Sequence, residues 1–313
     1  MEQIITLYQK PLKELLFQAI SLQGLRQKNI EKCSLLSIKT GGCSEDCKYC
    51  AQSSRYCSSV QIEKITDINY VVEKAREAKN SGSDYFCLSA AWRKVRDNLD
   101  FQTALKMVEA IKENVGIQVC CTFGMLTYEM AQKLKDAGVV YYNHNLDTSE
   151  SFYPEIITTR KYQDRLETLK NATQAGLKIC TGCILGLGEK VSDRIELIHT
   201  LKNLPHALDA FVLNTLIPIP GTPLEKNSHV PFKDVIRFIA VCRITLKNTQ
   251  LRWAAGRDYY SDAEQMLAML AGIDSIHVGA KLLTAKNHLF AKDAQFLKLF
   301  EEKIDSIDSL SLV

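Results

Sequence analysis

Two kinds of hydrophobic pattern alternate along most of this chain. Short apolar runs typical of buried strands are followed by longer stretches in which apolar residues recur every three or four positions, as in amphipathic helices. The predicted strands cover residues 33–39, 84–89, 117–122, 140–146, 178–184, 210–216, 250–254 and 275–279. The predicted helices cover residues 67–80, 101–113, 127–136, 163–174, 191–203, 232–247, 262–270 and 291–303. This alternation predicts parallel strands joined by helical crossovers.

Repeats of this kind favour a closed (β/α)8 barrel of the TIM type, for which about 250 residues is typical. An open, doubly wound sheet would show the same alternation, so the periodicity leaves both folds open. Several predicted helices end at a small residue followed by glycine, as at Ala137-Gly138 and Ala271-Gly272, and a strand follows shortly. Glycine after a helix is the usual left-handed stop, which supports these boundaries.

Residues 1–30 predict an N-terminal helical extension ahead of the first strand, because apolar residues from Leu12 to Ile20 recur at helical spacing. No linker, low-complexity tract or change in composition marks a second domain in the sequence. We therefore expect a single domain over residues 1–313, with a helical cap at 1–30, the barrel at about 33–280, and a C-terminal helix and tail at 288–313.

Composition narrows the functional class. The 39 basic and 36 acidic residues leave a net charge of +3, which is too balanced to indicate a nucleic acid or an anionic membrane as partner. No uncharged apolar run approaches the ~20 residues that a membrane helix needs, and residues 1–30 lack the pattern of a signal segment. The eleven cysteines, irregularly spaced, suit reduced thiols and metal ligands better than disulfides. We therefore expect a cytoplasmic protein.

Three of the cysteines, Cys43, Cys47 and Cys50, form a C-x3-C-x2-C loop directly after the first predicted strand. In a (β/α)8 barrel this is the end at which chemistry occurs. Clustered thiolates bind iron–sulfur clusters, zinc or Cu(I). A structural zinc site is usually closed by four ligands in two close pairs, and Cys33 and Cys57 lie outside pair spacing. The spacing therefore favours a cubane iron–sulfur cluster with one iron left for a ligand that is not protein.

This loop resembles the signature of radical S-adenosylmethionine (SAM) enzymes, and its flanks resemble the biotin synthase family. The matching segments are Ser-Ile-Lys-Thr-Gly-Gly at residues 37–42 and Ala-Gln-Ser-Ser-Arg-Tyr at residues 51–56. The similarity runs from about residue 11 to residue 287. It implies a [4Fe–4S] cluster on Cys43, Cys47 and Cys50, whose open iron is chelated by SAM.

Cysteines also occur on the predicted strands, and one strand carries an arginine. Cys87, Cys120 and Cys180 would each behave as a small buried hydrophobe if considered alone. Arg252 does not fit the interpretation as an ordinary core residue, because a buried guanidinium needs an anion, a polar ligand or water. The resemblance implies that these four residues hold a second, [2Fe–2S] cluster inside the barrel.

Side chains alternate between the two faces of a strand, and this alternation separates neighbouring cysteines. Cys121 is expected to face away from Cys120, and Cys183 away from Cys180. Neither Cys121 nor Cys183 matches a ligand position of the family.

Alternation also places Asn143, Asn145 and Asp147 on one face of the fourth predicted strand. Buried polar groups need partners, which a ureido ring or ribose hydroxyls would supply. The resemblance implies that SAM contacts Tyr49, Ala90, Trp92, Asn145, Asp147, Ile184 and Ile217. It implies that the substrate contacts Asn143, Asn145, Asn214 and Thr284. The family usually has a second threonine after the position of Thr284, where this chain has Ala285.

The resemblance implies an activity as well, the insertion of sulfur into dethiobiotin to form biotin. SAM cleavage would generate a 5′-deoxyadenosyl radical that removes hydrogen from the substrate, and the second cluster would supply the sulfur. A flavodoxin or ferredoxin is the expected electron donor, and a homodimer is common in the family. Another radical SAM enzyme, lipoyl-synthase-like or hydrogenase-maturation-like, is the nearest alternative. An electron carrier or a zinc-structured module is less favoured, because neither needs a polar face for a ligand.

Overall fold

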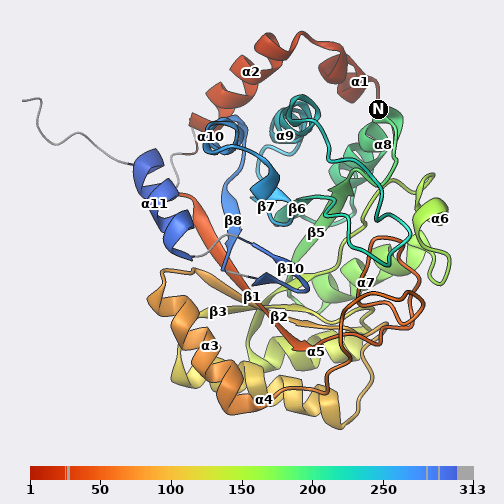
Figure 1. Ribbon diagram of the computed structural model, residues 1–313, viewed down its shortest axis with the longest axis vertical. Helices are drawn as coiled ribbons and strands as arrows, with labels where there is room; N and C mark the ends of the chain where they lie inside the picture. The colour runs from red at the N-terminus through yellow and green to blue at the C-terminus, as the bar shows by residue number, and fades with distance from the viewer. Residues whose placement is uncertain (25, 27–28, 280, 288–289, 302–313) are drawn as a thin grey trace, which may run out of the picture.

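The computed structural model describes residues 1–24, 26, 29–279, 281–287 and 290–301. Parallel strands β1 to β8 close into a barrel in chain order, with helices packed around the outside (Figure 1). The strands are β1 (Glu31–Lys39), β2 (Tyr85–Ala90), β3 (Gln118–Thr122), β4 (Val139–Asn143), β5 (Lys178–Leu185), β6 (Ala210–Thr215), β7 (Gln250–Trp253) and β8 (Ser275–Val278). Because β1 pairs with both β2 and β8, the closed barrel is confirmed and the open sheet is excluded.

The helices between the strands begin and end close to the predicted positions. They are α3 (Ile68–Asn80), α4 (Leu99–Asn114), α5 (Tyr128–Ala137), α7 (Tyr162–Gln174), α8 (Val191–Lys202), α9 (Phe232–Thr245) and α10 (Asp262–Ala271). Polar N-cap residues explain where several of these helices begin. At α3 the Asp67 carboxylate accepts from the backbone N–H of Asn69 at 2.8 Å, and at α10 Ser261 forms a capping box with Glu264. At the end of α5, Gly138 has a φ of 110°, the left-handed stop that the sequence predicted.

The N-terminal extension contains two helices where the sequence predicted one. The predicted helix is α2 (Leu12–Gly24), and α1 (Glu2–Gln9) precedes it. In the structure α2 packs against α9 and α10, while α1 packs against α8 and α9 (Figure 1). Leu15 and Ala19 of α2 are fully buried in this contact. Complete burial of a leucine contributes about 1.5–3 kcal/mol, so the extension stabilises the C-terminal half of the barrel.

The fourth strand is shorter than the predicted span of 140–146, since β4 ends at Asn143. Beyond it, the backbone N–H of Asp147 donates to Gly182 of β5 over 2.9 Å, and Asp147 adopts a positive φ of 68°. Regular alternation therefore does not extend to Asn145 and Asp147, and the strand argument for their common face was wrong. Backbone contacts with β5 hold this segment instead.

Several smaller elements were not predicted from the sequence. They are α6 (Tyr153–Ile156), the 3-10 helix η1 (Arg257–Tyr259) and a hairpin of β9 (Lys281–Leu282) and β10 (Ala285–Lys286). The hairpin matters for function, because it follows β8 directly and reaches the site described below. The predicted C-terminal helix is α11 (Phe290–Glu301), and the predicted tail at 302–313 lies outside the described residues.

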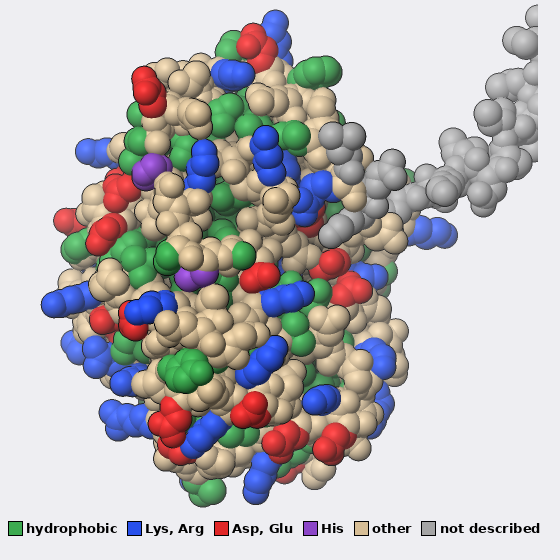
Figure 2. All heavy atoms as spheres, turned by 180° about the vertical axis from the view of Figure 1, so that it is seen from behind, with side chains coloured by type: hydrophobic (Ala, Val, Ile, Leu, Met, Phe, Trp, Pro, Cys, Tyr) green, Lys and Arg blue, Asp and Glu red, His purple; other side chains and the backbone are tan. Residues whose placement is uncertain are grey.

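The surface carries both signs of charge. Figure 2 shows acidic and basic side chains interspersed over the visible face, as expected from the balanced composition. Within the ranges that the structure describes, no helix combines the length and apolar character needed to cross a membrane.

Candidate active site

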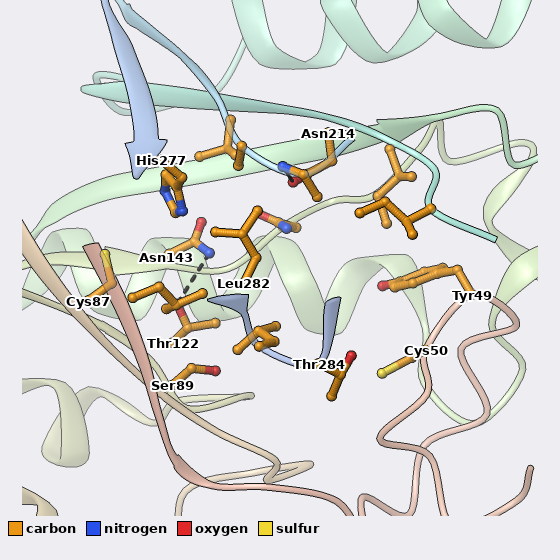
Figure 3. Close-up of a pocket in the computed structure, with 18 of the residues that line it drawn as sticks. Tyr49, Cys50, Cys87, Ser89, Thr122, Asn143, Asn214, His277, Leu282 and Thr284 are labelled. Carbon is orange, nitrogen blue, oxygen red and sulfur yellow. Dashed lines mark hydrogen bonds between the residues drawn. The ribbon is translucent and has the colours of Figure 1, made fainter. Parts of the chain in front are cut away.

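A cavity of about 240 Å³ occupies the interior of the barrel toward the C-terminal ends of its strands. Figure 3 shows Cys87 on one side of this cavity and Tyr49 and Cys50 on the other, with Asn143 and Leu282 between them. The cavity therefore connects the cysteine loop after β1 with the cysteines on the strands. Its lining also includes the remaining residues predicted for the inner cluster, Cys120, Cys180 and Arg252.

The strand cysteines lie on β2, β3 and β5, which follow one another closely in the order of the closed barrel. Cys87 on β2 lies opposite Cys120 on β3 in the pairing register, and both belong with Cys180 to one buried cluster inside the barrel. Cys121 and Cys183 belong instead to the core between strands and helices. The predicted separation of Cys121 from Cys120, and of Cys183 from Cys180, is confirmed.

Arg252 lies beside these thiols and is only 1% exposed. Its Nε donates to Ser275 Oγ at 3.1 Å, and its Nη2 donates to Gln250 Oε1 at 2.8 Å. The guanidinium carbon lies 5.3 Å and 5.9 Å from the ring centres of Tyr85 and Tyr141.

The electrostatic surroundings of Arg252 favour an anion at this point. Burial acts to lower the pKa of the guanidinium, but Coulomb attraction to the thiolate forms of the neighbouring cysteines outweighs burial and raises the pKa. Within the described parts of the chain, no carboxylate pairs with this guanidinium. A buried cation facing several thiols suits an anionic iron–sulfur cluster.

One inner cysteine was not predicted as part of the site. The Sγ atom of Cys33, on β1, lies 3.3 Å from the Sγ atom of Cys87, and Cys33 is fully buried. Cys33 stands two residues before Leu35, which lines the cavity, so strand alternation could have placed Cys33 on the same inner face.

The loop cysteines Cys43, Cys47 and Cys50 line a second, adjoining pocket. The loop is held by backbone hydrogen bonds, among them Cys43 N–H to Gln52 at 2.9 Å and Ser54 N–H to Cys43 at 2.7 Å. Burial raises the pKa of the Cys47 thiol to about 12 and that of the Cys50 thiol to about 11. Because a bound metal deprotonates its thiol ligands, metal binding would overcome this preference for the neutral form.

No set of three or more His, Cys, Asp or Glu side chains among the described residues is arranged to hold a single metal ion. An iron–sulfur cluster makes a different demand, because each cysteine binds its own iron and the bridging sulfides span the gaps. The cysteines that line these two pockets are therefore compared with the needs of a cluster and not with those of a single metal ion.

The residues predicted to contact SAM lie around the same two pockets. Ala90, Trp92 and Asp147 line the pocket of the loop cysteines, Ile184 and Ile217 line the larger cavity, and Tyr49 and Asn145 line both. Asp147 Oδ2 accepts from the hydroxyl of Tyr49 at 2.7 Å and from Arg165 of α7. Arg165 was missed, because nothing in the sequence indicates that this helical residue turns toward the end of β4.

The residues predicted to contact the substrate all line the larger cavity: Asn143, Asn145, Asn214 and Thr284. The amide oxygens of Asn143 and Asn145 are buried with no hydrogen-bond partner in the described structure. Gly182 leaves room for Asn145, because a Cβ there would lie 2.7 Å from its amide oxygen. Two buried acceptors facing a cavity suit a ligand with N–H donors.

Asn214 is placed differently from the other asparagines. Its amide nitrogen donates to Cys183 O at 3.0 Å, and its amide oxygen accepts from Ala255 N at 3.1 Å. The side chain thus joins β5 to the segment after β7 and keeps one N–H for a ligand.

The hairpin after β8 covers the cavity. Figure 3 shows Leu282 and Thr284, both from this hairpin, projecting toward the other labelled residues. The side chain of Ala285, which replaces the family's second threonine, lies outside the described set.

Two family models match the chain: "Radical SAM superfamily" over residues 37–201 and "Biotin and Thiamin Synthesis associated domain" over residues 212–301. The solved structures of HydG, a maturase of the [FeFe]-hydrogenase, and of methylornithine synthase (PylB) share the fold. HydG has a TM-score of 0.81 at 17% identity and covers 96% of this chain and 70% of its own. PylB has a TM-score of 0.79 at 16% identity, with 96% of this chain and 93% of its own covered.

Sequence relatives are much closer than these structures. A biotin synthase of Cytophaga hutchinsonii is 44% identical over 304 residues, which cover 96% of this chain and 90% of that protein. A biotin synthase of Salmonella arizonae is 46% identical, and the match covers 95% of this chain and 86% of that protein. A biotin synthase of Schizosaccharomyces pombe is 45% identical, and the match covers 94% of this chain and 82% of that protein. The chain therefore belongs to the biotin synthase family of radical SAM enzymes.

Proposed function

We propose that this enzyme inserts sulfur into dethiobiotin to form biotin, with a [4Fe–4S] cluster on the loop cysteines and a [2Fe–2S] cluster deep in the barrel. Membership of the family implies SAM and iron–sulfur clusters as cofactors. The observation that carries the proposal is one cavity that runs from Cys50 at the loop, past Asn143, to Cys87, Cys120 and Cys180. A substrate in this cavity would lie between two cluster sites, as sulfur insertion requires.

When bound, the outer cluster supplies the electron for SAM cleavage and the inner cluster supplies the sulfur. The residues proposed as ligands are Cys43, Cys47 and Cys50 for the outer cluster, and Cys87, Cys120, Cys180 and Arg252 for the inner cluster. The protein positions the reactants and excludes water, so its rigid strands matter more than any acid or base.

SAM is proposed to bind between the loop and the ends of β2, β4 and β5. Asp147 and Asn145 offer acceptors for ribose hydroxyls, while Tyr49 and Arg165 hold the Asp147 carboxylate in place. The remaining proposed contacts are Ala90, Trp92, Ile184 and Ile217, which present backbone or apolar surface.

Dethiobiotin is proposed to bind in the larger cavity, where its ureido ring is held by asparagine side chains. The free amide oxygens of Asn143 and Asn145 accept from the two ureido N–H groups, and the spare N–H of Asn214 donates to the carbonyl. Thr284, on the hairpin, is placed to receive the carboxylate end of the substrate. The hairpin would then exclude water from the radical chemistry.

Other parts of the proposal concern the whole protein. We propose a single domain over residues 1–313, a homodimer, a cytoplasmic location, and a flavodoxin or ferredoxin as electron donor. The balanced surface charge agrees with an enzyme that binds neither nucleic acid nor a membrane.

Anaerobic turnover with SAM, a reductant and dethiobiotin tests the function directly. Mass spectrometry is expected to detect biotin together with methionine and 5′-deoxyadenosine. SAM cleavage without biotin would instead indicate another radical SAM activity, lipoyl-synthase-like or hydrogenase-maturation-like. Zinc in place of iron and sulfide in the purified protein would contradict the proposal altogether.

A further inference from the structure

A further hollow of about 240 Å³ adjoins the cysteine loop, apart from the larger cavity and the pocket of the loop cysteines. Cys43, Ala91 and Trp92 line both this hollow and the pocket of the loop cysteines, so the two share a wall. Four basic residues also line the hollow, and we call them the basic rim: Lys39, Arg93, Lys94 and Arg96. Among the described residues around this hollow there is no Asp or Glu.

The basic rim carries positive charge that its surroundings do not neutralise. Lys94 and Arg96 are exposed, and in the described part of the chain no carboxylate forms an ion pair with either of them. Arg93 is half exposed and pairs with Glu45 of the cysteine loop at 2.7 Å. The acidic residue that follows the rim in the chain, Asp97, is already paired with Lys133. The rim therefore presents cations to the solvent directly beside the cysteine loop.

The basic rim is also held in a fixed position. Val95 N–H donates to Met125 O at 2.9 Å, and Met125 N–H donates to Arg93 O at 3.0 Å, so the segment after β2 is joined to the segment after β3. Gly124 permits this close approach, because a Cβ there would lie 2.3 Å from Trp92 O. A surface that is already ordered loses little conformational entropy when a partner binds.

We propose that the basic rim is the docking surface for a small acidic electron-transfer protein. The inference rests on the proposed function, in which each cleavage of SAM consumes one electron at the outer cluster. The carrier protein loses this electron and the outer site gains it, so no other reactant is needed. A carrier on the rim would contact the wall that contains Cys43, a proposed cluster ligand, and would thus be held close to the site that it reduces.

The charge of the rim determines which kind of carrier fits. A net charge of +3 over 313 residues gives the whole molecule little attraction for an anionic protein, so a local excess of cations has to guide the encounter. Complementary charges mainly raise the association rate, and salt screens them. An acidic carrier gains from this surface, whereas a neutral or basic one does not.

Binding of an acidic flavodoxin to the full, reconstituted chain tests the docking surface. In the double variant Lys94→Glu/Arg96→Glu the affinity is expected to fall about tenfold or more, mainly through slower association that depends less on salt. Arg76→Glu/Lys106→Glu is the matched control, because it changes the net charge equally at exposed positions on α3 and α4. Its affinity is expected to equal that of the unaltered chain, and equal weakening in both double variants would overturn the inference.

A charge-preserving variant separates the charge of the rim from its shape. Lys94→Arg/Arg96→Lys keeps both cations and is expected to bind flavodoxin as the unaltered chain does. Loss of binding in this variant would contradict docking by charge.

Two reductants separate docking from the chemistry of the site. With dithionite, a small reductant that needs no docking surface, Lys94→Glu/Arg96→Glu is expected to form 5′-deoxyadenosine at the unaltered rate. With a limiting concentration of reduced flavodoxin, the rate is expected to fall about tenfold. A slower rate with dithionite would show that these residues serve the site itself and would overturn the inference. Failure of the unaltered chain to cleave SAM with dithionite would overturn the proposed function instead, while the binding measurement still decides the docking surface.

Discussion

The hydroxyl of Tyr49 donates to Oδ2 of Asp147 over a distance of 2.7 Å. Tyr49 lies in the loop between Cys47 and Cys50, and Asp147 lies just beyond β4, so this bond joins the cysteine loop to the barrel. Asp147 is also paired with Arg165 and is only 1% exposed. The loop is therefore positioned by a buried polar contact as well as by its own backbone.

Tyr49→Phe is expected to weaken SAM binding about tenfold while leaving the outer cluster in place. A hydrogen bond to a charged group contributes about 1.5–3 kcal/mol, and its loss would free the Asp147 carboxylate to move away from the ribose. Equilibrium binding of SAM to the reconstituted protein measures this effect. Tyr70→Phe on the exposed surface of α3 is the control, and equal affinities in the two variants would refute the role of the bond.

Replacement of Cys43, Cys47 or Cys50 by alanine is expected to abolish reductive cleavage of SAM without unfolding the protein. These thiols lie in a loop at the end of the barrel, outside every strand and helix, and alanine keeps an apolar side chain at the buried position of Cys47. Production of 5′-deoxyadenosine and the far-UV circular dichroism spectrum are the two measurements. Cys57→Ala is the control because Cys57 is an exposed cysteine of the same segment. Normal 5′-deoxyadenosine formation in any of the three variants would exclude that cysteine as a ligand.

Asn143→Ala is expected to raise the KM for dethiobiotin roughly tenfold or more. The variant loses the unpaired amide oxygen that faces the cavity, and a hydrogen bond left unmade in a buried site costs about 1–3 kcal/mol. Its affinity for SAM should stay unchanged, because Asn143 lines the larger cavity and not the pocket of the loop cysteines. Asn69→Ala, at an exposed position on α3, is the control for both measurements. An unchanged KM would remove Asn143 from the proposed substrate contacts.

Reconstitution of the clusters with ³⁴S-labelled sulfide is expected to place the label in the first biotin formed. Cys180→Ala should still cleave SAM slowly but form no biotin, because the inner cluster would lose a ligand opposite Asn143 in the register. Cys183→Ala, on the same strand but outside the inner cluster, should retain biotin formation. Unlabelled biotin, formed while the labelled inner cluster stays intact, would show that the sulfur has another source.

Asp274→Ala is expected to lower the free energy of unfolding by about 3–5 kcal/mol, because it leaves the buried guanidinium of Arg243 without a carboxylate partner. Asp274 accepts from Arg243 and from Arg26 (3.2 Å), and its side chain is 2% exposed. Urea denaturation monitored by circular dichroism measures the change. Asp97→Ala breaks an exposed pair with Lys133 and should leave the urea midpoint unchanged. Equal midpoints for both variants would contradict the structural role of Asp274.

Much of the fold and of the outer site was predictable from the sequence, because it depends on local patterns. Strand and helix periodicities placed nearly every barrel element within two residues of its observed ends. The spacing of Cys43, Cys47 and Cys50 indicated a cluster loop, since ligands close in the chain are close in space. Alternation along β3 and β5 correctly separated Cys121 and Cys183 from the inner cysteines, because a regular strand turns successive side chains to opposite faces.

Only the tertiary structure decided which distant residues meet. Closure of the barrel brings Cys33 within 3.3 Å of Cys87, although 54 positions separate them in the chain. Arg165 reaches Asp147 from α7, and the backbone of β5 holds the segment after β4 where strand alternation has already ended. Periodicity reports the environment along one element, whereas these contacts depend on the register and closure of several elements, to which residues far apart in the chain contribute together.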